Sequence, residues 1–266
     1  MLVWSRPARW ALWCAFGALV AVFYGLPLAV IALASVAGEW NGIFPSKLGL
    51  LHYRMALSGD LRDQIRASLL TGLGASAAAL LAGSWAALAL RAHTEAVRKW
   101  LSLAFFIPSA VPSVSVGLGL LVAFSQPPLL LNGTTLIVLV AHFVLVFAFT
   151  FGNVSAGLHG LMPEFELVAR SLGATPGYCL RRITLPLIAP QLATAFSLSF
   201  ALSMGELGAT VMIYPPGWMT MPVGIFSLSD RGEVFDGSAL SILLILITLV
   251  ALLVVARLAE QGHDRR

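Results

Sequence analysis

The chain has 266 residues, of which 59% are hydrophobic and only 11% are charged, and its formal net charge is +4. Soluble domains carry about 25% charged residues, so this composition excludes a soluble fold and predicts an all-α integral membrane protein formed by a single domain, residues 1–266. The positive charge requires no nucleic-acid partner, because the basic residues stand beside apolar runs, as orientation signals do.

Six apolar runs are long enough to cross a bilayer, which takes about 20 residues. We expect spans at about residues 12–36, 68–90, 100–124, 135–157, 187–213 and 238–256. The first run is too long and too continuous for a cleaved signal peptide, so it is expected to remain as an anchor. After it, the stretch LGLLHYRMAL is expected to form a short interfacial helix.

The basic residues predict the orientation, because lysine and arginine are enriched in cytoplasmic loops. With six spans, most of them fall on the side that holds both termini: Arg6, Arg9, Arg91, Arg98, Lys99, Arg170, Arg181, Arg182, Arg257, Arg265 and Arg266. The other side holds Lys47, Arg54, Arg62, Arg66 and Arg231. Both termini and the loop 158–186 are therefore expected in the cytoplasm.

Small residues at four-residue spacing predict faces on which helices pack closely. Two such faces are Gly74, Ala78 and Ala82 in the second run, and Ala201, Gly205 and Ala209 in the fifth.

Motifs for nucleotide binding and catalysis are missing from the sequence. It contains no G-x-x-x-x-G-K-[ST], no H-E-x-x-H, no Cys/His cluster and no G-x-S-x-G. We therefore expect no catalytic residue, no metal site and no cofactor on this chain. Energy for any transport has to come from an ion gradient or from another polypeptide.

A polar stretch, ARSLGATPGYCLRRITLPL, separates the fourth and fifth runs. Pro163 suits the first position of a helix, and acids follow it where the helix dipole favours them. Phe165, Val168, Ala169 and Leu172 then form one apolar stripe. Gly173 stands where a helix end favours a left-handed residue.

A second short helix is expected after that turn. Thr175 and Pro176 read as its N-cap and first residue, and it is expected to stop before Pro186, which starts the fifth span. Such a segment is either a solvated loop rich in arginine or a docking surface that offers its apolar stripe to a groove. The stripe beside the turn favours docking.

The same segment resembles the cytoplasmic signature of permease subunits of bacterial ABC importers of the binding-protein-dependent type. That signature reads E-A-A, three residues, G, nine residues, I-x-L-P. Here Gly173 and the later positions keep the spacing, whereas the acid, Glu166, comes one position early and only one alanine of the triplet remains. The matching positions are Glu166, Ala169, Gly173, Ala174, Ile183, Leu185 and Pro186. Given the shifted acid, we expect the turn and the stripe, rather than an ion pair from Glu166, to define the segment.

The resemblance implies a type I ABC importer permease fold in a bacterial inner membrane. It implies ATP bound by two copies of a partner ATPase docked on this loop, a second permease chain (a different subunit or a second copy), an external substrate-binding protein and membrane lipid. The strings FFIPSAVPSVSVGLGLLVAFSQPPL and LSMGELGATVMIYPPGWMTMPVGIFSLSDRG are similar to permeases of 2-aminoethylphosphonate importers. GELGAT is shared with permeases of the molybdate, sulfate and polyamine type, so these substrates stay as alternatives.

Glu206 stands inside the fifth run, where a charge is costly unless it faces the bundle interior. Ser199, Ser203 and Thr210 lie on its helical face at spacings of seven, three and four residues. Two interpretations stay open: these residues line a translocation pathway, or Glu206 is neutral or paired and only locks helices together.

Two prolines, Pro108 and Pro112, predict a kink in the third run next to a cavity. The carbonyls that they free are expected to find partners in Ser109, Ser113 and Ser115. His142 is expected to be a hydrogen-bonded core histidine. An ion-driven secondary transporter is the alternative function, although such proteins usually show inverted repeats and several intramembrane charges.

Overall fold

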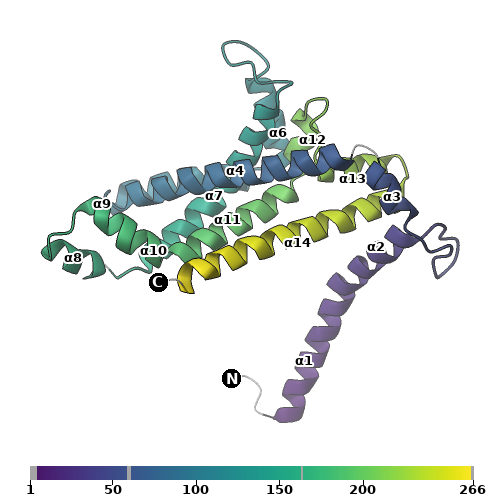
Figure 1. Cartoon of the computed structure of the whole chain (residues 1–266), viewed down its shortest axis with the longest axis horizontal. Helices are drawn as coiled ribbons and strands as arrows, with labels where there is room; N and C mark the ends of the chain where they lie inside the picture. The colour runs from purple at the N-terminus through teal and green to yellow at the C-terminus, as the bar shows by residue number, and fades with distance from the viewer. Residues whose placement is uncertain (1–4, 59–60, 163, 265–266) are drawn as a thin grey trace. The chain divides into compact units, whose positions relative to one another are not determined.

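The computed structural model describes residues 5–58, 61–162 and 164–264, and in this part of the chain every named element is helical. Pro163, Arg265 and Arg266, which entered the predictions above, lie outside the described residues. The backbone contacts divide the chain into two compact units: 1–61 with 224–245, and 62–223 with 246–266. Figure 1 traces the elements in order.

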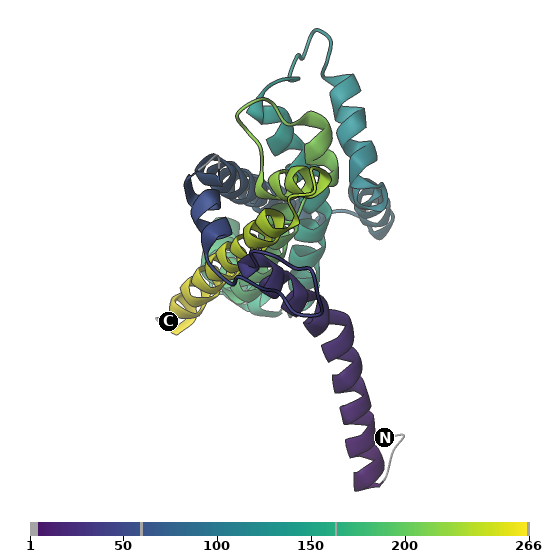
Figure 2. The same cartoon turned by 90° about the vertical axis from the view of Figure 1, so that its right-hand side faces the viewer.

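Unit 1 begins with a continuous helical rod, formed by α1 (Arg6–Val20), a π-helical turn η1 (Ala21–Gly25) and α2 (Leu26–Val36). It is the purple helix in Figures 1 and 2. Pro27 explains the turn, because it has no N–H for the carbonyl four residues earlier and the wider π turn absorbs the missing bond. No side chain of α1 is buried within the chain, as expected of a helix that faces lipid or another subunit.

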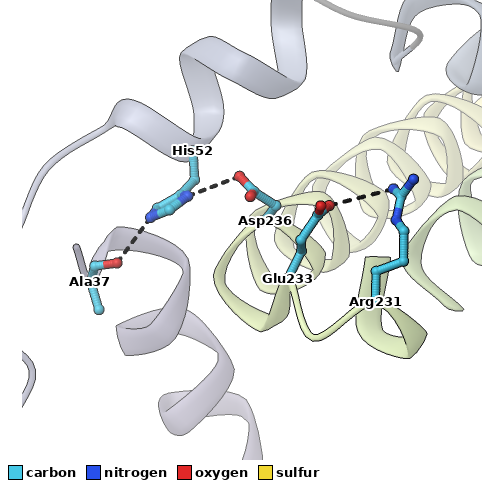
Figure 3. A network of polar contacts seen from close by, with 5 residues as sticks. All are labelled: Ala37, His52, Arg231, Glu233 and Asp236. Carbon is cyan, nitrogen blue, oxygen red and sulfur yellow. Dashed lines mark hydrogen bonds and ion pairs between the residues drawn. The ribbon is translucent and has the colours of Figure 1, made fainter. Parts of the chain in front are cut away.

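The short helix predicted after the first span is present as α3 (Leu51–Ser58). Its His52 lies 2.8 Å from Asp236 through Nδ1 and 3.0 Å from the Ala37 carbonyl through Nε2. Figure 3 shows this network beside the Arg231–Glu233 ion pair. Polar contacts thus fasten α3 to the end of α2 and to the start of α14 (Val234–Asp264).

Unit 2 is built on α4 (Leu61–Leu90), α7 (Thr135–His159) and α11 (Ala189–Met204), and α11 packs along α7. The buried face of α4 carries small residues, but not the predicted ones. Ala75 and Ala79 are fully buried, whereas Gly74 and Ala78 are exposed. The buried small residues do repeat every four positions, as predicted, but they stand one position later than the predicted ones. Small residues occupy both of these faces of α4, so the sequence alone does not distinguish the face that packs.

The third predicted span is a pair of helices, α5 (Glu95–Ala110) and α6 (Ser113–Ala123), that meet at 98°. The break falls at Val111, whose φ and ψ of −91° and 136° are extended. A residue before proline is excluded from the helical region, so Pro112 causes the break. Pro108 stays inside α5, and the angle between α5 and α6 confirms the predicted kink. Ser109 Oγ donates to the Phe106 carbonyl at 2.7 Å, which neither proline frees, so the role predicted for this serine is wrong.

The fifth predicted span is also interrupted. A helical stretch through residues 176–187 meets α11 at 64°, and α11 ends at Met204. The chain is non-helical at Glu206 and resumes as α12 (Gly208–Ile213), so the continuous span 187–213 is wrong in this detail. The predicted face of Ala201, Gly205 and Ala209 is broken at the same place. After a turn at Gly217, α13 (Met221–Asp230) leads to α14.

Four helices of the described chain are long and apolar enough to span a membrane: 6–36, 61–90, 135–159 and 234–257. Each bent pair adds one more span if its two helices cross together, which brings the total to six.

Candidate functional site

The segment that joins α7 to α11 is called the 164–187 segment below. It consists of α8 (Glu164–Ser171), a turn at Gly173, α9 (Pro176–Cys179), a π-helical turn η2 (Leu180–Thr184) and α10 (Leu185–Leu187) (Figure 1). Gly173 has a φ of +88°, the left-handed conformation that its position predicts. The Ala174 N–H donates to the Ala169 carbonyl at 3.0 Å and the Gly173 N–H to that of Arg170 at 2.9 Å. This pattern is the Schellman motif, which closes a helix end on glycine.

The second half of the segment also starts as predicted. Thr175 Oγ1 accepts the hydrogen bond of the Tyr178 N–H at 3.3 Å and so caps α9. The predicted stop before Pro186 is wrong, because the helix continues through that residue to Leu187 and bends at Ile188. As at Pro27, a π turn two residues earlier compensates the absent proline N–H. Pro190, rather than Pro186, lies in the first turn of α11.

The apolar stripe of α8 is exposed within the described chain. Phe165 and Val168 are about half exposed, and Leu172 is 83% exposed. Beside it, an open depression of about 470 Å³ is lined by Ala169, Leu172, Gly173, Ala174, Thr175 and Tyr178. Exposed apolar side chains around a hollow are typical of a surface that another protein covers.

Glu166 anchors the segment from inside, although the sequence favoured the turn and the stripe over an ion pair from this residue. Its Oε1 accepts from Arg91 at 2.9 Å and from the Thr184 hydroxyl at 2.6 Å. The hydrogen bond from Thr184 is the main reason that the pKa of Glu166 lies below its ordinary value; burial opposes this, and Arg91 and Arg170 add to it. One carboxylate thus ties α8 to η2 and to the end of α4.

The remaining signature positions form the base of the segment rather than its exposed stripe. Ile183, Leu185 and Pro186 are half-buried. Leu185 packs against the buried cluster that includes Phe151 and Ile188. The base of the segment therefore packs against the ends of α7 and α11.

A second feature is an open cavity of about 230 Å³ at the two helix breaks, lined by equal numbers of polar and apolar residues. Its polar lining consists of Ser109, Ser113, His142, Ser203 and Glu206. Three of the predicted pathway residues, Ser109, Ser203 and Glu206, therefore come together. Glu206 Oε1 accepts the hydrogen bond of the Ala209 N–H at 2.7 Å, which caps α12.

The other predicted pathway residues do not line this cavity. Ser199 lies 2.6 Å from the Thr150 hydroxyl, and Thr210 lies 2.8 Å from His142 Nε2. Both are fully buried, so they join α11 and α12 to α7. Pro108 and Pro112 act on the backbone, by shaping α5 and by breaking it from α6.

His142 is the residue that sequence reasoning placed in the core and not in the site. Its Nδ1 lies 2.6 Å from Ser203, so together with the Thr210 contact the ring is hydrogen-bonded on both sides, as predicted. It also reaches the cavity wall. The helix breaks at Pro112 and after Met204 were the missing signal, because residues beside both breaks line one cavity with His142 of α7.

Close backbone contact holds α12 against α6 at this cavity. A Cβ added to Gly117 would lie 2.7 Å from the Ala209 Cα, and one added to Gly208 would lie 2.3 Å from Ser113 Oγ. Only glycine permits this approach. The G-E-L-G motif therefore places Glu206 between a helix end and a glycine that packs on α6.

Comparison with known proteins agrees with these features. Residues 79–265 match the family described as "Binding-protein-dependent transport system inner membrane component". The chain is 56% identical over 261 residues to the "Putative 2-aminoethylphosphonate transport system permease protein PhnV" of Salmonella paratyphi A, covering 98% of both proteins. It is 26% identical over 242 residues to the "Spermidine/putrescine transport system permease protein PotC" of Escherichia coli K12, covering 90% of this chain and 91% of that protein.

Among solved structures, a chain of a bacterial alginate ABC transporter in complex with an alginate-bound periplasmic protein shares the fold. The TM-score is 0.78 at 18% identity, over 96% of this chain and 95% of that one. The family match covers well over half of the sequence. The chain therefore belongs to the inner-membrane components of binding-protein-dependent transport systems, the multi-pass permease subunits of ABC importers.

Proposed function

We propose that the chain is the transmembrane subunit of an ATP-driven importer of 2-aminoethylphosphonate. The observation that carries this proposal is the 56% identity to a protein named for that transport, over nearly the full length of both chains. In this proposal the chain acts as a single permease domain with six spans, each bent helix pair counting as one. Both termini and the 164–187 segment face the cytoplasm.

A partner ATPase, in two copies per importer, docks on the exposed stripe of α8 and binds the ATP. The depression between Leu172 and Tyr178 receives part of that partner. When ATP binding closes the ATPases, α8 moves, and the Glu166 contacts pass the motion to η2 and α4. The half-buried Leu185 passes it to the base of α11.

The cavity at the helix breaks belongs to the substrate pathway. The Glu206 carboxylate offers an acceptor for the ammonium end of 2-aminoethylphosphonate, and the Ser113 hydroxyl offers a donor for a phosphonate oxygen. Helix ends and unwound backbone line binding sites in transporters because water and substrate satisfy the freed polar groups. A second permease chain, either a copy of this one or a different subunit, completes the pathway, and an external binding protein delivers the substrate.

Docking is tested with Leu172→Asp, which places a charge on the stripe where no folded contact is lost. The full chain is expressed with the candidate ATPase and purified from detergent extract. The variant is expected to lose most of the ATPase while its membrane level stays normal. Ile43→Asp is the matched control, since Ile43 is 88% exposed in unit 1 and should retain the partner. An ATPase retained equally by both variants contradicts the docking site.

Substrate is tested by uptake of labelled 2-aminoethylphosphonate into proteoliposomes that hold the assembled importer, ATP and the binding protein. Uptake is expected to need ATP and to resist competition by sulfate, molybdate and spermidine. Competition by one of these at low concentration assigns the chain to that substrate instead. Uptake that follows an ion gradient without ATP removes the importer mechanism altogether.

A further inference from the structure

A basic pocket of about 300 Å³ lies where α4 ends, α5 begins and α7 ends. Its lining includes Arg91, Arg98, Lys99 and His159, with Glu95 as its acidic member. Ser102 and Ser155 are its other polar lining residues, and buried apolar side chains of α4 and α7 form the floor. The pocket is distinct from both the exposed stripe of α8 and the cavity at the helix breaks.

The cations of this pocket are only partly neutralised by the protein. Over the described residues, neither Arg98 nor Lys99 has an ion-pair partner, and Arg91 is shared with Glu166 outside the pocket. His159 uses Nδ1 to donate to the Ser155 carbonyl at 2.6 Å, so the donors left free for a ligand are those of Arg98 and Lys99. The site is therefore built to attract an anion with several acceptor oxygens.

The position of the pocket indicates where such an anion comes from. Two long apolar helices end at it, and α5 carries the exposed Trp100, Leu101 and Leu103 directly after the two cations. Tryptophan beside basic residues at the end of an apolar run marks the level of lipid headgroups. Basic pockets between membrane helices at that level suit acidic lipids.

We infer that this pocket binds the phosphate of an acidic membrane lipid such as phosphatidylglycerol. Arg98 and Lys99 hold the phosphate oxygens, the serine hydroxyls donate to the headgroup, and the acyl chains lie along the exposed apolar face of α5. Arg91 lines this pocket and also pairs with Glu166, so the bound headgroup and Glu166 both interact with its guanidinium. Lipid binding at this pocket is independent of the transported substrate and of ATP coupling.

The test is an equilibrium titration of the purified full chain in neutral detergent with short-chain phosphatidylglycerol. Arg98→Gln with Lys99→Gln is expected to weaken binding about 30-fold, since each cation near the headgroups contributes about fivefold. Exchanging the two, Arg98→Lys with Lys99→Arg, should retain the affinity. Glu95→Gln should strengthen it several-fold, because a like charge leaves the rim.

Two further arms identify the ligand and exclude a general charge effect. Short-chain phosphatidylcholine and inorganic phosphate should bind more than tenfold more weakly than phosphatidylglycerol. The control, Arg181→Gln with Arg182→Gln, removes two adjacent exposed arginines outside the pocket and should change the affinity less than threefold. Equal affinities for the double variant and wild type overturn the site, as does equal weakening by the control. Inorganic phosphate that binds as tightly as the lipid overturns the assignment to a headgroup.

Discussion

Glu166→Gln is the substitution that tests how the 164–187 segment is held. The variant keeps an oxygen for the Thr184 hydroxyl but removes the charge that faces Arg91. The side chains of Arg91 and Glu166 are 32% and 22% exposed, so this pair is neither fully screened nor deeply buried. Hydrogen bonds to charged groups contribute about 1.5–3 kcal/mol and exposed pairs about 0.2–1 kcal/mol, which places the loss at about 1–2 kcal/mol.

Hydrogen exchange of the full chain in detergent measures that loss directly, because α8 opens locally. A loss of about 1–2 kcal/mol makes the amides of α8 exchange roughly 5- to 30-fold faster, while α7 and α11 stay unchanged. Glu164→Gln is the matched control, since Glu164 is an exposed acid in the same first turn. Equal exchange rates in the two variants refute the proposed anchoring role.

The pH dependence of this effect follows from the direction of the pKa. The pKa of Glu166 is lowered from 4.5, chiefly by the Thr184 hydrogen bond, so the stabilisation is present above that value and is lost as the pH falls through the lowered pKa. Wild type and Glu166→Gln should therefore differ by the same amount from pH 6 to pH 8. A difference that already disappears in this range contradicts the ionised pair.

The other predictions concern the cavity and two pairs of glycines. Glu206→Gln should keep normal membrane levels and thermal stability but lower uptake, whereas Glu206→Ala should also cost about 1 kcal/mol in a melting experiment, because the cap of α12 is lost. Gly117→Ala should destabilise by about 1–3 kcal/mol through overpacking against α12, and Gly119→Ala, where nothing lies within 4 Å, should be neutral by the same measurement. Gly173→Ala should destabilise the end of α8 by about 1–2 kcal/mol because of the left-handed backbone at this position, whereas Gly177→Ala, in a helix with open space around it, should have a smaller effect. Hydrogen exchange of α8 measures both, and equal exchange rates in the two variants would argue against the turn.

The helical fold and most helix positions could be predicted from sequence because they depend on local properties. Apolar runs of sufficient length, the break at Pro112, the left-handed Gly173 and the Thr175 cap each follow from a few neighbouring residues. The π turns were not predicted, although Pro27 and Pro186 supply the same local cause in both. The stop assigned to Pro186 was wrong for that reason.

Predictions that needed the partner of a side chain were less successful. Ser199 and Thr210 share a helical pattern with Glu206, yet they face α7 and do not line the cavity. The pattern assumed an unbroken helix, whereas the chain is non-helical at Glu206, between α11, which carries Ser199, and α12, which carries Thr210. Likewise, the stripe of α4 that packs was one step away from the expected one, because small residues occupy both faces.

By itself, the sequence determined that this protein belongs in a bilayer, where its helices lie, and that the apolar stripe of α8 ends at a glycine turn, since hydrophobicity, proline and glycine act over a few residues. Only the tertiary structure decided that Glu166 meets Arg91 across 75 positions, and that His142, Ser203 and Glu206 share one cavity. These contacts depend on which faces of separate helices pack together. That choice is made by the summed packing of whole helices, which no short stretch of sequence encodes.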